Sequence, residues 1–296
     1  MTNAFKTEEG RQLVFNRYKE ILANWPVKNK QYSVSTSIGS TFIIESGRDD
    51  KPSLILLHGS VSNSFTWFTD VIELSNKFKV FAVDVIGDAG LSEMVRPGYR
   101  SGAYEKWLHE LMGALNIESA HFAGISLGGW MAINFGIHFP RMARSIFLIS
   151  PGGLSRVKRS FLWKVLLYSL SGNKRKIFIL LNGGKDNGLS HQFKSAMAFT
   201  GLINKHFKPR TDELPVFKSE ELAQLTMPVM LVFGAKDCIF NADESALLLT
   251  GATPQAEVII YPDAGHIIVD QSEKMIDFFE KPSHNIQPND VTKHDK

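Results

Sequence analysis

The sequence predicts an α/β protein with a mostly parallel central sheet and helices on both of its faces. Short apolar runs recur along the chain, helix-like segments lie between several of them, and the 296 residues, 44% of them hydrophobic, suffice for a large core. The apolar runs are residues 53–58, 79–85, 120–126, 145–150, 228–234 and 256–262. The helix-like segments are residues 101–116, 127–139 and 241–250. Runs that are apolar throughout suit strands buried on both faces, and their alternation with helices is typical of a parallel sheet.

Two further elements are predicted before the first of these runs. Residues 8–25 have a helical pattern, in which several apolar side chains fall roughly on one side. These side chains are Leu13, Phe15, Tyr18, Leu22 and Trp25. Residues 31–46 alternate between polar and apolar around a central glycine, which predicts a β-hairpin.

The alternation of strands and helices is interrupted once. Residues 154–220 are apolar and basic by turns, and we expect them to form a helical cap inserted after the sixth strand, over the carboxyl edge of the sheet. The core domain would then consist of residues 1–153 and 221–280. The polar, proline-interrupted residues 281–296 are expected to form a disordered tail.

Charge and cysteine content exclude several classes of protein. The formal net charge of +3 is small and spread along the chain, so it does not indicate a nucleic-acid partner. The single cysteine, Cys238, cannot form an internal disulfide. The N-terminus has no signal-peptide pattern, and the most apolar window, residues 161–170, is too short to span a bilayer. We therefore expect a cytoplasmic protein without stable membrane insertion.

The stretch G-I-S-L-G-G at residues 124–129 is the first candidate for chemistry. It contains the pattern G-x-S-x-G, which alone is a weak signal, but it ends one apolar run and begins a helix-like segment. In this setting a serine, here Ser126, lies on a strained turn, and neighbouring glycines remove Cβ atoms that would clash. The candidate glycines are Gly124, Gly128 and Gly129.

A serine hydroxyl needs a base, and the base needs an orienting carboxylate. Asp237 and His266 each follow a later predicted strand, so both are expected at the carboxyl edge, where Ser126 also lies. Two rivals for the acid remain open. Asp243 better suits the start of the following helix, and Asp263 follows the last strand instead of the one before it.

The motifs H-G, G-x-S-x-G-G, G-x-x-D and G-H occur in one order over roughly residues 30–280. In these motifs the chain resembles the capped α/β-hydrolases, and it is most similar to bacterial carboxylesterases of the branch that includes naproxen esterase. The resemblance implies that Ser126 is the nucleophile, His266 the general base and Asp237 its orienting acid.

The resemblance also implies an oxyanion hole. It would be formed by the backbone N–H groups of Leu127, directly after the nucleophile, and of Ser60, in the loop after the H-G motif. One departure from the family pattern is evident. D-V-I-G-D-A-G-L-S carries one residue more than the usual D-x-x-G-x-G-x-S, between Gly87 and Gly90, so no pocket role is assigned to Asp88.

These observations predict a serine hydrolase that cleaves small apolar esters. The expected cap is rich in Phe, Trp, Leu and Met residues, and a pocket lined by such side chains favours an apolar or aryl acyl group. No trusted metal-ligand spacing and no nucleotide-binding fingerprint occur, so no cofactor or metal is expected. The alternatives are hydrolysis of thioesters, lactones or carbon–carbon bonds, cofactor-free perhydrolysis, or, from a different class, a non-catalytic small-molecule receptor.

Overall fold

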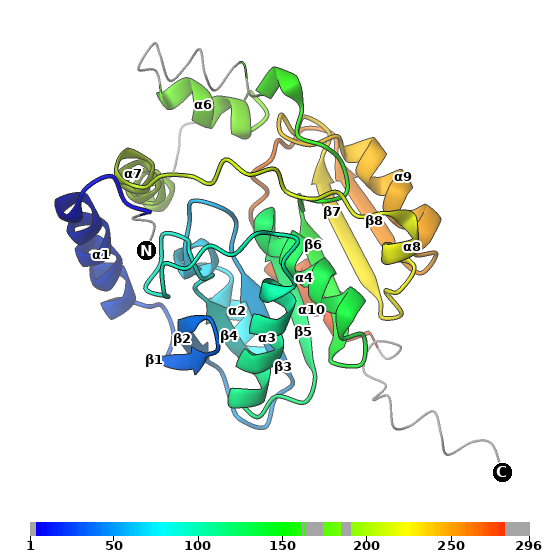
Figure 1. Cartoon of the computed structure of the whole chain (residues 1–296), viewed down its shortest axis with the longest axis horizontal. Coiled ribbons are helices and arrows are strands. Elements are labelled where there is room, and N and C mark those ends of the chain that lie inside the picture. Colours follow the sequence, from blue (N-terminus) through cyan, green and yellow to red (C-terminus); the bar gives the residue numbers. More distant parts are fainter. Residues whose placement is uncertain (1–3, 162, 164–173, 185–190, 282–296) are drawn as a thin grey trace.

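A computed structural model describes residues 4–161, 163, 174–184 and 191–281 of the chain (Figure 1). Its centre is an eight-stranded sheet in the order β1-β2-β4-β3-β5-β6-β7-β8. The strands are β1 Asn29–Thr36, β2 Gly39–Ser46, β3 Ser53–Leu57, β4 Lys79–Val83, β5 Ala120–Ile125, β6 Ala143–Ile149, β7 Val229–Gly234 and β8 Glu257–Tyr261. All six predicted runs are strands, and residues 31–46 form the predicted hairpin.

The sheet is parallel except at one edge. Strands β1 and β2 pair antiparallel, as do β2 and β4, whereas every pairing from β4 to β8 is parallel. Parallel strands need crossover connections, and helices supply most of them here. The parallel strands therefore end at one common edge, where the loops that follow them meet.

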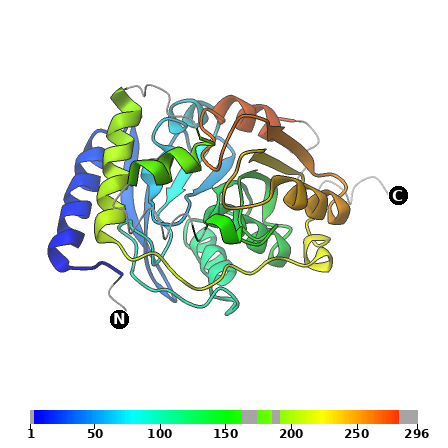
Figure 2. The same ribbon diagram turned by 90° about the horizontal axis from the view of Figure 1, so that it is seen from above.

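Helices cover both faces of the sheet (Figures 1 and 2). They are α1 Glu8–Ala23, α2 Val71–Lys77, α3 Ala103–Ala114, α4 Leu127–His138, α6 Lys174–Leu181, α7 His191–His206, α8 Ser219–Leu222, α9 Ala242–Ala252 and α10 Ser272–Phe279, with the 3-10 helix η1 Ser64–Trp67. One hydrophobic cluster joins the sheet to α3, α4, α8 and α9. A second cluster joins it to α1, α2, α7 and α10.

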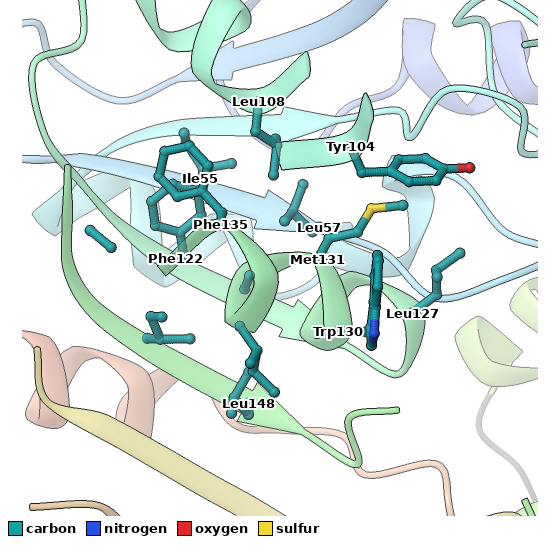
Figure 3. Close-up of a cluster of buried hydrophobic side chains, with 14 of the residues drawn as sticks. Ile55, Leu57, Tyr104, Leu108, Phe122, Leu127, Trp130, Met131, Phe135 and Leu148 are labelled. Atoms are coloured by element: carbon teal, nitrogen blue, oxygen red, sulfur yellow. The ribbon is translucent and has the colours of Figure 1, made fainter. Parts of the chain in front are cut away.

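Strand β3 illustrates why the runs are apolar at every position. Ile55 and Leu57 belong to the first cluster, whereas Leu54 and Leu56 belong to the second. Successive side chains of a strand point to opposite faces, so a strand buried on both faces has no polar position. Figure 3 shows part of the first cluster, in which Trp130 of α4 packs against Tyr104 of α3 with ring centroids 6.2 Å apart.

Helix α1 confirms the helix predicted over residues 8–25, although it ends at Ala23. Its buried residues are Gly10, Val14, Tyr18 and Leu22, which recur every four residues. Leu13, an apolar residue of the same helical pattern, is 52% exposed and lies outside this buried row. Position 13 lies one residue away from the buried row, and the side chain instead lines a shallow surface groove with residues of α7.

Among the described residues, helices α6 and α7 lie in the expected insertion after β6. The helix expected over residues 161–170 and the tail expected over 281–296 fall almost entirely outside the described residues. In the described part of the chain, no helix has the length and hydropathy needed to cross a membrane.

Candidate active site

Ser126 lies in the sharp turn between β5 and α4. Its backbone has φ 51° and ψ −108°, a combination that a residue with a Cβ atom rarely adopts. Such a conformation costs about 1–3 kcal/mol and persists only where its surroundings hold it. The Ser126 N–H donates to the carbonyl of Ile149 at 3.0 Å, and its carbonyl accepts from the N–H groups of Trp130 at 3.1 Å and Gly152 at 3.0 Å.

Close backbone approach explains the glycines around Ser126. A Cβ atom on Gly124 would lie 2.4 Å from the carbonyl oxygen of Gly128. A Cβ atom on Gly128 would lie 2.1 Å from the carbonyl oxygen of Leu57, at the end of β3. Real Cβ atoms do not approach backbone oxygens so closely, so helix α4 can begin this near β3 and β5 only because side chains are absent here.

Asp237 lies in the turn after β7 and contacts His266, which follows β8. The Nδ1 atom of His266 donates to Asp237 Oδ2 over 2.8 Å. The other carboxylate oxygen, Oδ1, accepts from the backbone N–H groups of Ile239 at 2.7 Å and Phe240 at 3.1 Å. An ionised carboxylate only accepts, so this contact puts a proton on Nδ1 and leaves Nε2 of a neutral ring as an acceptor.

Further contacts hold the turn that carries Asp237. The Nζ atom of Lys158 donates to the Asp237 carbonyl at 2.7 Å, and the Lys158 N–H donates to the carbonyl of Ile239, also at 2.7 Å. The Phe240 ring lies 5.7 Å from the His266 ring. Lys158 was not a sequence candidate, because nothing in the spacing of a single lysine indicates which distant turn it braces.

The two rival acids lie elsewhere. Asp243 is exposed in the first turn of α9, where a negative charge favours the helix N-terminus. Asp263 forms an ion pair with Lys236 at 2.7 Å, and its side chain is 69% exposed. Asp237 is the carboxylate bonded to His266, and its side chain is fully buried.

Ser126 and His266 lie in loops that follow β5 and β8 at the same edge of the sheet. Both residues are described, and no hydrogen bond joins them in this structure. Hydrogen bonds between nucleophile and base are often long in the absence of substrate and tighten in the complex.

The loop after β3 carries Ser60 and lies against Ser126. A Cβ atom on Gly59 would be 3.4 Å from the Cβ atom of Ser126. His58 braces this loop, because its Nε2 accepts from the Val85 N–H at 2.9 Å and its Nδ1 lies 2.8 Å from the Gly59 carbonyl. On the other side of Ser126, Leu127 is the first residue of α4, so its N–H has no acceptor within the helix.

Two aspartates hold the loop after β4, the one with the extra residue. Asp84 Oδ1 accepts from the Ser64 N–H at 2.8 Å and Asp84 Oδ2 from the Leu91 N–H at 2.8 Å. Asp88 Oδ1 accepts from the Ser62 N–H at 3.2 Å, and burial raises the pKa of the Asp88 carboxyl. Asp88 therefore ties this loop to the one carrying Ser60, a role that sequence reasoning missed although the inserted residue marked the loop as unusual.

No group of three or more His, Cys, Asp or Glu side chains suited to a metal ion occurs in the part of the chain that the structure describes. The described residues place a strained serine at the sheet edge that also carries a histidine bonded to a buried carboxylate. These are the components that acyl transfer through a serine nucleophile requires.

Comparison with known proteins gives the same family from sequence and structure. A family model described as "Alpha/beta hydrolase family" matches residues 54–278. The chain is 30% identical over 263 residues to "Uncharacterized carboxylesterase nap" of Bacillus subtilis, a match that covers 86% of each protein. It is 28% identical to "Carboxylesterase YbfK" of the same organism, over 89% of this chain and 90% of that one.

Solved structures of carboxylesterases are also similar to this chain. The crystal structure of naproxen esterase (carboxylesterase NP) from Bacillus subtilis has a TM-score of 0.80 and 27% identity, covering 93% of this chain and 100% of that one. The structure of carboxylesterase CesB (YbfK) has a TM-score of 0.79 and 26% identity, covering 92% and 99%.

Proposed function

The chain belongs to the alpha/beta hydrolase family, and from this premise we propose that it is a carboxylesterase in which Ser126 is the nucleophile. His266 is the general base and Asp237 the acid that orients it. The observation that carries this proposal is the 2.8 Å hydrogen bond from His266 Nδ1 to Asp237 Oδ2, at the sheet edge where the strained Ser126 also lies. The similarity to two Bacillus carboxylesterases supports ester hydrolysis as the reaction.

In the first step the Ser126 oxygen attacks the ester carbonyl while His266 Nε2 takes its proton. The charge of Asp237 stabilises the imidazolium that forms, and the backbone N–H groups of Leu127 and Ser60 stabilise the oxyanion. Removing one such donor costs about 3–4 kcal/mol of transition-state stabilisation in enzymes of this kind. His266 then gives its proton to the leaving alcohol, and an acyl-enzyme remains on Ser126.

In the second step a water molecule repeats the attack. His266 takes a proton from the water, the hydroxide adds to the acyl carbon, and the acid is released as the proton returns to Ser126. The two reaction steps as proposed need no cofactor, because the base, the acid and the oxyanion donors all come from the protein.

The proposal includes a division of the chain into a core, residues 1–153 and 221–280, and a cap, residues 154–220, in a cytoplasmic protein. Contacts from the insertion to the loops of Asp237 and His266 support a cap at this edge. An apolar or aryl acyl group is the proposed substrate preference, because the insertion is rich in large apolar side chains.

The decisive experiment combines a covalent probe with a substrate panel. A fluorophosphonate, which forms an oxygen–phosphorus bond with an activated serine and releases fluoride, should label the wild-type protein but not Ser126→Ala. Labelling or ester turnover that survives this substitution refutes the assignment of the nucleophile.

The panel compares p-nitrophenyl esters of straight-chain and aryl acids with thioesters, lactones and vinylogous diketones. We expect the highest kcat/KM for apolar or aryl esters. Higher kcat/KM for another substrate class would reassign the reaction on the same three residues. Binding of a small molecule without turnover of any substrate would favour a receptor.

A further inference from the structure

The C-terminal end of α6 lies directly against the loop that carries His266. The carbonyl oxygen of Leu181, the last residue of α6, accepts from the backbone N–H of His266 at 2.7 Å and from that of Ile267 at 3.2 Å. Helix α6, green in the upper part of Figure 1, is more than eighty positions away from His266 in sequence. Helix α6 therefore holds the main chain of the proposed base.

Glycines on both sides allow this contact. A Cβ atom on Gly265 would lie 2.2 Å from the Gly183 nitrogen and 2.3 Å from the Leu181 carbonyl oxygen. A Cβ atom on Gly234, at the end of β7, would lie 2.2 Å from the Gly265 carbonyl oxygen. Three backbone segments are thus stacked without side chains between them, so the His266 loop cannot shift far unless the end of α6 shifts with it.

Two backbone hydrogen bonds cap the end of α6. The N–H of Gly183 donates to the carbonyl of Leu180 at 3.3 Å, and that of Gly184 donates to the carbonyl of Ile179 at 2.8 Å. With φ of +69° at Gly183, these two bonds form a Schellman cap. The cap ends the helix at the point where the Leu181 carbonyl faces the His266 loop.

His266 is consequently held at two points. Its ring is oriented by Asp237 at Nδ1, and its main chain is held by Leu181. Lys158, in the same insertion after β6, holds the Asp237 carbonyl. The insertion thereby contacts the main chain of both the proposed base and its orienting acid.

We propose that the C-terminal end of α6 is a positioning element for His266. The Leu181 carbonyl fixes the position of the His266 main chain, and Gly183 permits the close approach of α6 to the His266 loop. This inference rests on the proposed function of His266 as the base. A displacement of about 1 Å in a catalytic group can reduce turnover by about 100-fold. Perturbing this junction should therefore affect the chemical step more than substrate binding.

Two adjacent glycines supply a matched pair of variants. Both have positive φ, +69° at Gly183 and +86° at Gly184, so alanine introduces backbone strain at either position. A Cβ atom on Gly183 would lie 2.9 Å from the Gly265 nitrogen, whereas one on Gly184 would have nothing within 4 Å. Only Gly183→Ala therefore pushes against the His266 loop.

We expect Gly183→Ala to lower kcat about 10- to 100-fold with KM changed less than about 3-fold, and Gly184→Ala to leave both within about 3-fold. Gly183→Asn should match Gly183→Ala, since asparagine tolerates positive φ but also carries a Cβ atom.

Equal effects of Gly183→Ala and Gly184→Ala on kcat, or a change in KM as large as the change in kcat, would overturn the inference. That outcome would leave the proposed function intact, provided that Ser126→Ala is inactive and is not labelled by the fluorophosphonate. Turnover by Ser126→Ala would instead refute the proposed function itself.

A measurement on the wild-type protein covers the case in which the Gly183 variants do not fold. Amide hydrogen exchange should show the His266 N–H to be protected, in keeping with its bond to Leu181. Exchange of this amide at the rate of an unstructured peptide would contradict the junction directly.

Discussion

Replacing Asp237 with asparagine separates the orientation of His266 from the folding of its loop. Asparagine keeps an oxygen that can accept from the N–H groups of Ile239 and Phe240, which contact Oδ1 at 2.7 and 3.1 Å. Its NH₂ group would replace the carboxylate oxygen that now lies 2.8 Å from His266 Nδ1. Because NH₂ donates, Nδ1 must give up its proton, which moves to Nε2 and prevents that atom from accepting the Ser126 proton.

The expected loss is large in activity and small in stability. A histidine held in the wrong tautomer in this arrangement lowers kcat about 10⁴-fold, which corresponds to about 5 kcal/mol of barrier. Asp237→Ala should lose comparable activity but also leave the buried N–H of Phe240 and the part-buried N–H of Ile239 without an acceptor, at about 1–3 kcal/mol for the buried group. Hydrolysis of p-nitrophenyl butyrate gives kcat, and urea denaturation gives the free energy of unfolding.

Asp243→Asn and Asp263→Asn are the matched controls, because both change an aspartate close in sequence to the proposed acid or base. Each should retain kcat within about 3-fold, since both side chains are exposed. Retention of more than a tenth of wild-type kcat by Asp237→Asn, or a 10⁴-fold loss in either control, would refute the assignment of the acid.

Two further outcomes test the packing and the electrostatics. Gly128→Ala should destabilise the fold by about 3 kcal/mol or more in urea denaturation, because its Cβ atom would lie 2.1 Å from the Leu57 carbonyl oxygen. Gly113→Ala in α3, whose Cβ atom would have nothing within 4 Å, should instead stabilise the fold by about 0.5–1 kcal/mol. Equal effects of the two substitutions would contradict the steric argument. Burial, reinforced by the charge of Asp270, raises the pKa of Asp70 from 3.8 to about 7, so the folded state keeps a proton that the unfolded state loses, and this group's contribution to stability falls as pH rises between those values. Asp270→Asn should lower the pKa of Asp70 and flatten that fall, seen as a smaller loss of unfolding free energy between pH 5 and pH 8 than in the wild type; an unchanged loss would show that the two groups do not interact.

The strand runs were predictable because burial on both faces leaves a strong local signal. Leu54 and Leu56 pack on one face of β3, and Ile55 and Leu57 on the other, so every position is apolar. The side of α1 that is buried was harder to assign. Leu13 is apolar but exposed, and packing of α1 against α7 and η1 decides which side of the helix faces inward.

The loop after β4 shows a different limit. The extra residue between Gly87 and Gly90 was visible in the sequence, but its consequence was not. Asp88 accepts from the Ser62 N–H in the neighbouring loop. That contact depends on two loops meeting at the sheet edge, and no pattern within either loop encodes it.

By itself, the sequence determined the order of the strands and helices and the placement of Ser126, Asp237 and His266 just after strands that share one edge. These properties depend on local periodicity and on the rule that parallel strands end together. The sequence motifs favoured Asp237 as the acid, but only the tertiary structure shows the contact: Asp237 is buried against His266, whereas the rival Asp263 is exposed and pairs with Lys236. Only the tertiary structure also shows that Leu181 holds the His266 main chain. A backbone contact between distant segments requires no particular side chain, apart from glycines where the two backbones approach closely.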